Sequence, residues 1–83
     1  MTYRIRWELT AWRAWRKLDA RLGLQLLHAV TDLAANPTPA ASTALVGAGE
    51  FRRLRVGDYR VIYSIHVDTV TIHEVGHRRE IYD

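Results

Sequence analysis

The strongest constraint on the fold is a pattern of alternating side chains on both sides of Gly57-Asp58. A two-residue turn at this position would join residues 50–56 and 59–66 into a β-hairpin. The register of such a hairpin gives these pairs: Val56 with Tyr59, Arg55 with Arg60, Leu54 with Val61, Arg53 with Ile62 and Arg52 with Tyr63. Because paired residues share a face of the sheet, this register predicts what each face carries.

The predicted hairpin separates apolar from basic side chains. One face, with Arg52 as its exception, is apolar: Leu54, Val56, Tyr59, Val61, Tyr63 and Ile65. The other face carries Arg53, Arg55 and Arg60. Arg55 lies opposite Arg60, and like charges across a strand pair cost stability unless an anionic or acidic group lies between them. This face is therefore either a solvated sheet surface or a phosphate-binding surface.

The first part of the chain predicts a strand followed by two helices. Apolar and basic residues alternate from Tyr3 to Trp7, which is the period of a half-buried strand. From Thr10, a possible N-cap, apolar residues recur every three to four positions, as in a short helix. Asp19 can cap a second helix, and Asn36-Pro37 ends it because a residue before proline disfavours helical geometry.

The remaining segments complete a single domain over residues 1–83. Residues 38–49 have no clear period and predict a connecting loop, and residues 69–75 predict the last strand. The predicted fold class is α+β, in the order β-α-α-β-β-β. We expect a small, largely antiparallel sheet with a two-helix layer on one face, which leaves the other face available for a site.

Composition narrows the function classes. With 83 residues, 48% of them apolar and 25% charged, the chain is an ordinary globular domain. It has no cysteine, which excludes disulfides and thiolate nucleophiles, and no apolar run of membrane-spanning length. We expect a cytoplasmic protein with no membrane partner. The net charge is +3 and all but one of the twelve basic residues are arginine, which favours a polyanionic partner.

Histidine and tyrosine side chains supply further candidates. The four histidines form no compact ligand motif, so no metal site is expected. Because histidine is the residue type most often used for proton transfer near neutral pH, His77 is a candidate general acid or base, or it can be a hydrogen-bonded structural histidine. Tyr82 can stack on a base or donate a proton, or it can pack on the sheet edge.

Two segments of the chain resemble the centre and the end of RelE-type toxins of the RelE/ParE superfamily. These are Phe51-Arg52-Arg53-Leu54-Arg55-Val56-Gly57-Asp58-Tyr59-Arg60-Val61-Ile62-Tyr63 and Val75-Gly76-His77-Arg78-Arg79-Glu80-Ile81-Tyr82. The strand, the helical hairpin and the loop that precede them also resemble this family, so the likeness covers essentially the whole chain.

The resemblance implies the toxin of a type II toxin-antitoxin system. Such a toxin is an endoribonuclease that cleaves messenger RNA on the ribosome and is neutralised by a cognate antitoxin protein. It uses neither a metal nor another cofactor. The 2′-hydroxyl of the cleaved nucleotide attacks the adjacent phosphate, so the site must accept a proton and stabilise negative charge on phosphorus.

The family's motif places a role on individual residues. By resemblance, Arg60 and Arg78 would stabilise the charged phosphorus and Tyr82 would orient the attacking nucleotide. Arg53 and Arg55 lie where some members have catalytic lysines, although a shift of one residue would place Arg52 there instead.

Because arginines stand where some family members have catalytic lysines, the identity of the general base is open. An arginine is effectively always protonated and cannot accept the proton. We prefer His77, which adjoins Arg78, over Glu50; a third possibility is catalysis by the guanidinium charges without a base. Two other readings of the chain stay open: a ParE-like inhibitor of DNA gyrase, and a non-catalytic RNA-binding module or degenerate toxin that binds its antitoxin.

Overall fold

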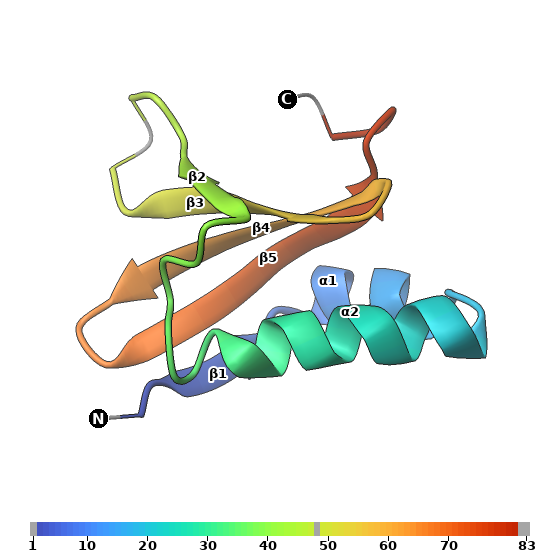
Figure 1. Ribbon diagram of the computed structural model, residues 1–83, viewed down its shortest axis with the longest axis horizontal. Coiled ribbons are helices and arrows are strands. Elements are labelled where there is room, and N and C mark those ends of the chain that lie inside the picture. Colours follow the sequence, from blue (N-terminus) through green and yellow to red (C-terminus); the bar gives the residue numbers. More distant parts are fainter. Residues whose placement is uncertain (1, 48, 82–83) are drawn as a thin grey trace.

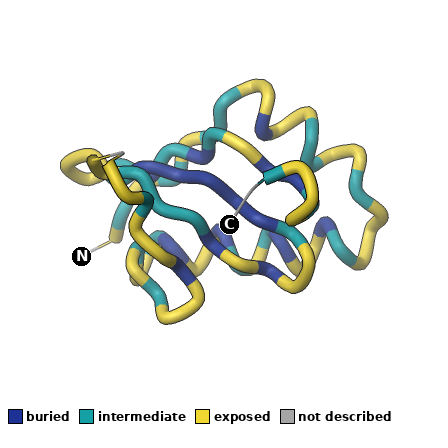
Figure 2. The backbone as a smooth tube through the Cα atoms, turned by 90° about the horizontal axis from the view of Figure 1, so that it is seen from above, coloured by how far each residue is buried: buried dark blue, intermediate teal, exposed yellow. Residues whose placement is uncertain are grey.

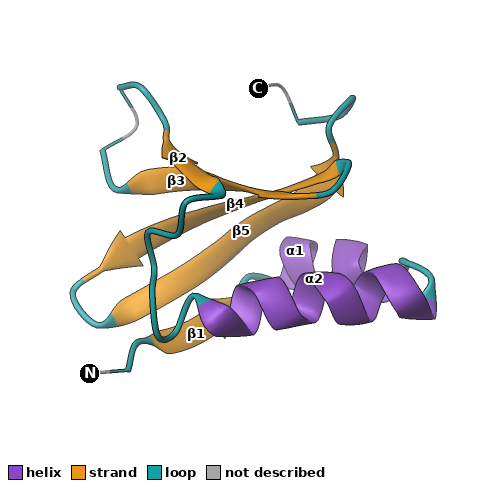
Figure 3. Ribbon diagram, in the orientation of Figure 1, coloured by secondary structure: helices purple, strands orange, loops and turns teal. Residues whose placement is uncertain are grey.

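The computed structural model describes residues 2–47 and 49–81 and has two layers (Figures 1 and 3). Its elements in chain order are β1 (Arg4–Trp7), α1 (Leu9–Arg16), α2 (Ala20–Asp32), β2 (Ser42–Ala44), β3 (Phe51–Val56), β4 (Tyr59–His66) and β5 (Thr69–His77). The five strands form one sheet in the order β1-β5-β4-β3-β2. Both helices lie on the same face of the sheet (Figure 1). The predicted α+β class and its one-sided helix layer are therefore confirmed.

The hairpin of β3 and β4 has the predicted register. Arg55 pairs with Arg60 and Val56 with Tyr59, around a turn in which Gly57 has a φ of 59°. Most of the predicted apolar face is buried beneath the helices, and this core follows the central strands in Figure 2. The core residues that this hairpin contributes are Leu54, Val56, Val61 and Tyr63, with Tyr59 and Ile65 packed at the margin.

Arg52, the exception on the apolar face, is anchored by a partner that its own hairpin does not supply. Its Nε and Nη2 atoms donate hydrogen bonds to Ser42 Oγ over 3.1 Å and 3.0 Å. Nη2 also donates to the Ser42 carbonyl oxygen over 3.3 Å. The guanidinium of Arg52 therefore fastens β2 to β3 and is separated by the sheet from the three arginines of the opposite face.

The prediction of a loop over residues 38–49 is wrong for Ser42–Ala44. This segment forms β2, which pairs with β3 through Ser42 opposite Leu54, Thr43 opposite Arg53 and Ala44 opposite Arg52. A three-residue strand of small side chains has no period to detect, and it forms because β3 offers an unpaired edge. The sheet consequently has one strand more than predicted.

The boundaries of the helices differ from the predicted ones. The first helix begins at Leu9 with Glu8 at the N-cap, so the prediction of Thr10 as its cap is wrong. Glu8 still donates its backbone N–H to the Ile72 carbonyl oxygen (2.9 Å), and the chain turns into the helix directly after this last sheet contact. The Asp19 cap is confirmed, because its side chain accepts from the Leu22 N–H over 3.0 Å. The second helix ends at Asp32, a few residues before Asn36.

The last strand is longer than predicted and is irregular. It continues to His77 and pairs with β1 in parallel and with β4 in antiparallel orientation. Tyr63 pairs with Ile72 but Ile62 pairs with Glu74, so His73 is an extra residue, as in a β-bulge.

Candidate functional site

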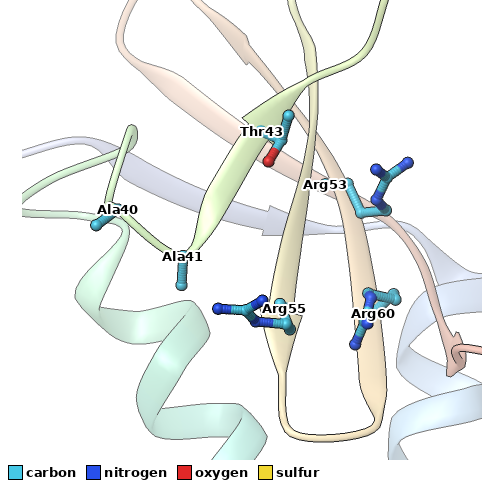
Figure 4. A pocket seen from close by; sticks show the side chains of 6 residues that line it. All are labelled: Ala40, Ala41, Thr43, Arg53, Arg55 and Arg60. Carbon is cyan, nitrogen blue, oxygen red and sulfur yellow. The ribbon is translucent and has the colours of Figure 1, made fainter. Parts of the chain in front are cut away.

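The three arginines predicted for the face opposite the helices line one hollow. It has a volume of about 180 Å³ and lies over β2, β3 and β4. Its lining residues are Ala40, Ala41, Thr43, Arg53, Arg55 and Arg60 (Figure 4). The register explains this grouping, because Arg55 pairs with Arg60 and Arg53 lies two residues away on the same strand. We call these three side chains the arginine cluster.

The guanidinium groups of the arginine cluster point in different directions. In Figure 4, Arg55 extends toward Ala41, Arg60 extends along its strand toward the β3–β4 turn, and Arg53 extends the opposite way. Arg55 is exposed and Arg53 is half-buried. The cluster therefore presents its positive charge around the rim of a hollow instead of converging on one point.

Arg60 is the most constrained member, with only 8% of its surface exposed. Its Nη1 donates hydrogen bonds to the carbonyl oxygens of Gly57 and Tyr59, each over 3.0 Å. An arginine held in this way supplies a charge with a fixed position, which is how a site stabilises developing negative charge without reorganisation.

The C-terminal segment folds back over the same face of the sheet (Figure 1). Gly76 pairs with Arg60, and a Cβ atom at Gly76 would lie 3.1 Å from Ile81 Cδ1 and 3.2 Å from its Cγ1. The absence of a side chain at Gly76 is what allows the segment to pack this closely. The segment therefore lies on the strand next to Arg60.

The structure does not bring His77, the base preferred from the sequence, to the arginine cluster. His77 pairs with Tyr59, whose side chain is on the helix-bearing face, and the two rings meet edge to face at 5.4 Å. Its Nδ1 accepts the backbone N–H of Arg79 over 3.1 Å. These contacts are typical of a structural histidine at the end of β5, and they do not support His77 as the base at the arginine cluster.

Arg78 lies at the β3–β4 turn beside Asp58. Its backbone N–H donates to the Asp58 carbonyl oxygen (2.8 Å), and its Nε lies 3.7 Å from Asp58 Oδ1. Its side chain is 55% exposed, so this ion pair contributes little to stability. Arg60 is bonded at the same turn, so both arginines of the family motif lie near it. Tyr82 lies outside the described residues.

Glu50, the other candidate base, lies at the far end of the hairpin. Its Oε2 is 3.2 Å from His66 Nδ1, and both side chains are largely exposed. Glu50 precedes β3, and its carboxylate contacts His66 at the last position of β4, beyond the paired residues Phe51 and Ser64. The position of Glu50 therefore does not support a role in proton transfer at the arginine cluster.

The sequence did not indicate that Ala40, Ala41 and Thr43 line the hollow. Ala41 and Thr43 reach it because β2 pairs with β3, and small side chains leave the space that Arg55 occupies. The described residues contain no grouping of three or more His, Asp or Glu side chains suited to a metal ion. Within the same residues, no helix has the length and apolar character needed to cross a membrane.

Comparisons with known proteins identify the class to which this fold and site belong. A family model described as the ParE toxin of type II toxin-antitoxin system, parDE, matches residues 5–82. The chain therefore belongs to this family of toxins, within the RelE/ParE superfamily. No curated protein sequence matches the chain.

Solved structures with the same fold include several RelE toxins. The archaeal RelE–RelB complex from Pyrococcus horikoshii OT3 matches with a TM-score of 0.83 and 29% identity, over 94% of this chain and 97% of that one. The RelBE2 complex from Mycobacterium tuberculosis matches with a TM-score of 0.81 and 30% identity, over 94% and 100%. A free E. coli RelE with arginines replaced by alanine matches with a TM-score of 0.81 and 25% identity, over 98% and 88%.

Proposed function

We propose that this toxin is a metal-independent endoribonuclease that cleaves messenger RNA on the ribosome. The observation that carries the proposal is the arginine cluster, which places Arg55 directly opposite Arg60 on the sheet face away from the helices. Like charges on paired residues cost folding stability, and RNA phosphates bound around the hollow would offset that cost. A positively charged hollow of this kind suits a phosphodiester and gives an apolar ligand little to bind.

The arginines act at two stages of the reaction, in binding the RNA phosphates and in stabilising the charge that develops on phosphorus. The exposed Arg55 and half-buried Arg53 bind the phosphates of the RNA strand as it enters the hollow. Arg60, fixed at the turn, and Arg78, beside the same turn, add positive charge from the turn end of the hollow, which helps to stabilise the additional charge on phosphorus when the 2′-hydroxyl attacks. Tyr82 orients the attacking nucleotide. The products are a 2′,3′-cyclic phosphate and a 5′-hydroxyl.

The partner that holds this toxin inactive is a cognate antitoxin protein. The structures from Pyrococcus horikoshii and Mycobacterium tuberculosis are toxin-antitoxin complexes, and the chain is similar to their RelE components over almost its full length. The ribosome with bound messenger RNA is the second partner, because cleavage is fast only when the reacting groups of the RNA are held in position.

A second candidate function is the inhibition of DNA gyrase. It is favoured by the family model, whose printed description is a ParE toxin, while the most similar solved structures include RelE toxins. Fold alone does not choose between the two, since one scaffold carries different activities. The arginine cluster also suits a DNA backbone, so the two functions must be separated by experiment.

The test is induced expression of the chain without its antitoxin, followed by mapping of messenger RNA 5′ ends and a gyrase supercoiling assay. The matched variants are wild type and an Arg60→Ala, Arg78→Ala double mutant. We expect new 5′ ends in phase with codons in the wild type and their loss in the double mutant. Inhibited supercoiling with intact messages would establish the gyrase function instead, and growth arrest with neither effect would leave a binding protein.

A further inference from the structure

A second group of polar side chains on the sheet forms a chain of hydrogen bonds outside the arginine cluster. The Nδ1 atom of His73 contacts Glu8 Oε1, and its Nε2 lies 2.7 Å from Ser64 Oγ. Glu8 lies between β1 and α1, Ser64 lies on β4 and His73 lies on β5. Carboxylate, imidazole and hydroxyl are thus connected in the order that hydrolytic enzymes use to transfer protons.

The bulge in β5 gives His73 its position. The register shift opposite Ile62 and Tyr63 leaves His73 as the extra residue, and bulges redirect side chains in this way, often beside active sites. Ser64 alternates with Ile62 and Arg60 along β4, so it shares their face of the sheet. The imidazole of His73, which bonds to Ser64, therefore lies on the same face as the arginine cluster.

The contact between His73 and Phe51 places His73 near Arg53, the member of the arginine cluster closest to Phe51 along β3. The Phe51 and His73 rings pack with their centroids 4.8 Å apart. Arg53 follows Phe51 by two residues on β3, which separates their Cα atoms by about 7 Å. Arg53 extends away from the β3–β4 turn in Figure 4, so a phosphate bound by its guanidinium lies toward the His73 end of the arginine cluster.

Glu8 determines how the imidazole is oriented. It occupies the N-cap of α1, yet its side chain makes no capping hydrogen bond and contacts His73 instead. Because a carboxylate only accepts, Nδ1 carries a hydrogen and donates it, which leaves the Nε2 lone pair to accept a proton. The resting partner of that lone pair is the Ser64 hydroxyl.

We propose that His73 is the general base of this toxin, with Glu8 as its positioning residue; the inference rests on the proposed function. The 2′-hydroxyl replaces Ser64 at Nε2, and its O–H bond breaks as the N–H bond forms. The 2′ oxygen bonds to phosphorus and the bond to the 5′ oxygen breaks. The departing 5′ oxygen takes a proton from water, and Glu8 stabilises the imidazolium until it returns its proton to solvent.

The exposure of the two side chains favours His73 over Ser64 as the group that contacts the RNA substrate. The His73 side chain is 24% exposed, whereas Ser64 as a residue is 7% exposed and lies in the middle of a central strand. Glu74 is the rival base, because it pairs with Ile62 and is exposed on the arginine face. The experiment must therefore separate a histidine base from a carboxylate base.

The test is single-turnover cleavage of a defined messenger RNA on purified ribosomes, with RNA-binding affinity measured on the same proteins. The variants are His73→Gln, Glu74→Gln and, as the matched control, His28→Gln on the exposed surface of α2. Glutamine retains hydrogen-bonding capacity but cannot act as the base, so His73→Gln should slow cleavage by about 100-fold or more. We expect RNA affinity to be unchanged in all three and the rates of the other two to stay near wild type.

Chemical rescue separates proton transfer from a structural role. Added imidazole should restore cleavage by His73→Ala, in proportion to its unprotonated fraction, and should not accelerate the wild type. If His73→Gln alters the fold, as judged by its melting temperature, Glu8→Gln tests the same chain of contacts. We expect slower cleavage in this variant with unchanged RNA affinity.

Each outcome bears on one proposal or the other. Cleavage by His73→Gln at the wild-type rate, or loss of cleavage in Glu74→Gln instead, would overturn the assignment of the base and leave the endoribonuclease function intact. A wild-type protein that binds ribosomes but cuts no message would overturn the proposed function itself.

Discussion

Arg52 and Arg55 have different roles because their side chains lie on opposite faces of the same strand. The Arg52 guanidinium makes three hydrogen bonds to Ser42 on the helix-bearing side, while Arg55 is exposed at the rim of the hollow and pairs with Arg60 across the two strands. One arginine therefore joins β2 to the sheet, and the other adds charge to a surface. Alanine at each position should affect different properties of the protein.

Arg52→Ala should lower the free energy of unfolding by about 1–2 kcal/mol, since hydrogen bonds to a partly exposed charged group are lost. Arg55→Ala should change stability by less than about 0.5 kcal/mol, because an exposed side chain is removed. Arg55→Ala should also reduce the slope of log affinity against log salt for single-stranded RNA by about 0.7. Urea unfolding and RNA titrations at several salt concentrations measure both effects. The reverse pattern would contradict the assignment of the two faces.

Val67 is the one non-glycine residue with a positive φ among the described residues, at 55° in the turn between β4 and β5. A β-branched side chain is strained in this region, whereas asparagine tolerates it. Because Val67 is 81% exposed, its replacement loses little buried surface. Val67→Asn should raise the free energy of unfolding by about 1 kcal/mol. The control is Val46→Asn, also fully exposed, which should have no effect; equal effects of the two changes would rule out relief of backbone strain.

Among the elements, α2 depends on its first turn. Asp19 accepts the Leu22 N–H, and Leu26, Val30 and Leu33 follow on the buried side of the helix. Asp19→Ala should lower the free energy of unfolding by about 1 kcal/mol, because a capped N–H loses its partner. Asp19→Asn keeps an accepting oxygen and should retain most of the stability in the same urea titration. Equal losses in both variants would show that charge, and not the cap, is what stabilises this end.

The packing of the C-terminal segment on β5 can be tested as an element by itself. A methyl group at Gly76 would press on Ile81, so Gly76→Ala should lower the free energy of unfolding by about 1 kcal/mol. In an Ile81→Ala background the same change should cost almost nothing, because the obstructing side chain is gone. A double-mutant cycle measures this coupling. Additive effects would show that the segment does not rest on Gly76.

At the scale of the whole molecule, local patterns predicted the elements and missed what depends on contacts distant in sequence. The β3–β4 register was predictable because Gly57 lies between two alternating segments, and the arginine cluster followed from that register. The strand Ser42–Ala44 could not be predicted in this way, because it forms only by pairing with the edge of β3. The contact between Glu8 and His73 joins residues 65 positions apart and depends on a bulge, so no local signal marked it. His77 was misplaced because adjacency to Arg78 says nothing about the face of a strand.

The account as a whole rests on an RNA 2′-hydroxyl attacking its own phosphate at the arginine cluster. The most direct measurement compares two messenger RNAs on programmed ribosomes, identical except for a single 2′-deoxynucleotide at the position that is cut. We expect the toxin to cleave the all-ribose message to a 2′,3′-cyclic phosphate and to bind the substituted message without cutting it. Cleavage of both messages at the same bond would contradict the account, because the nucleophile would then come from elsewhere.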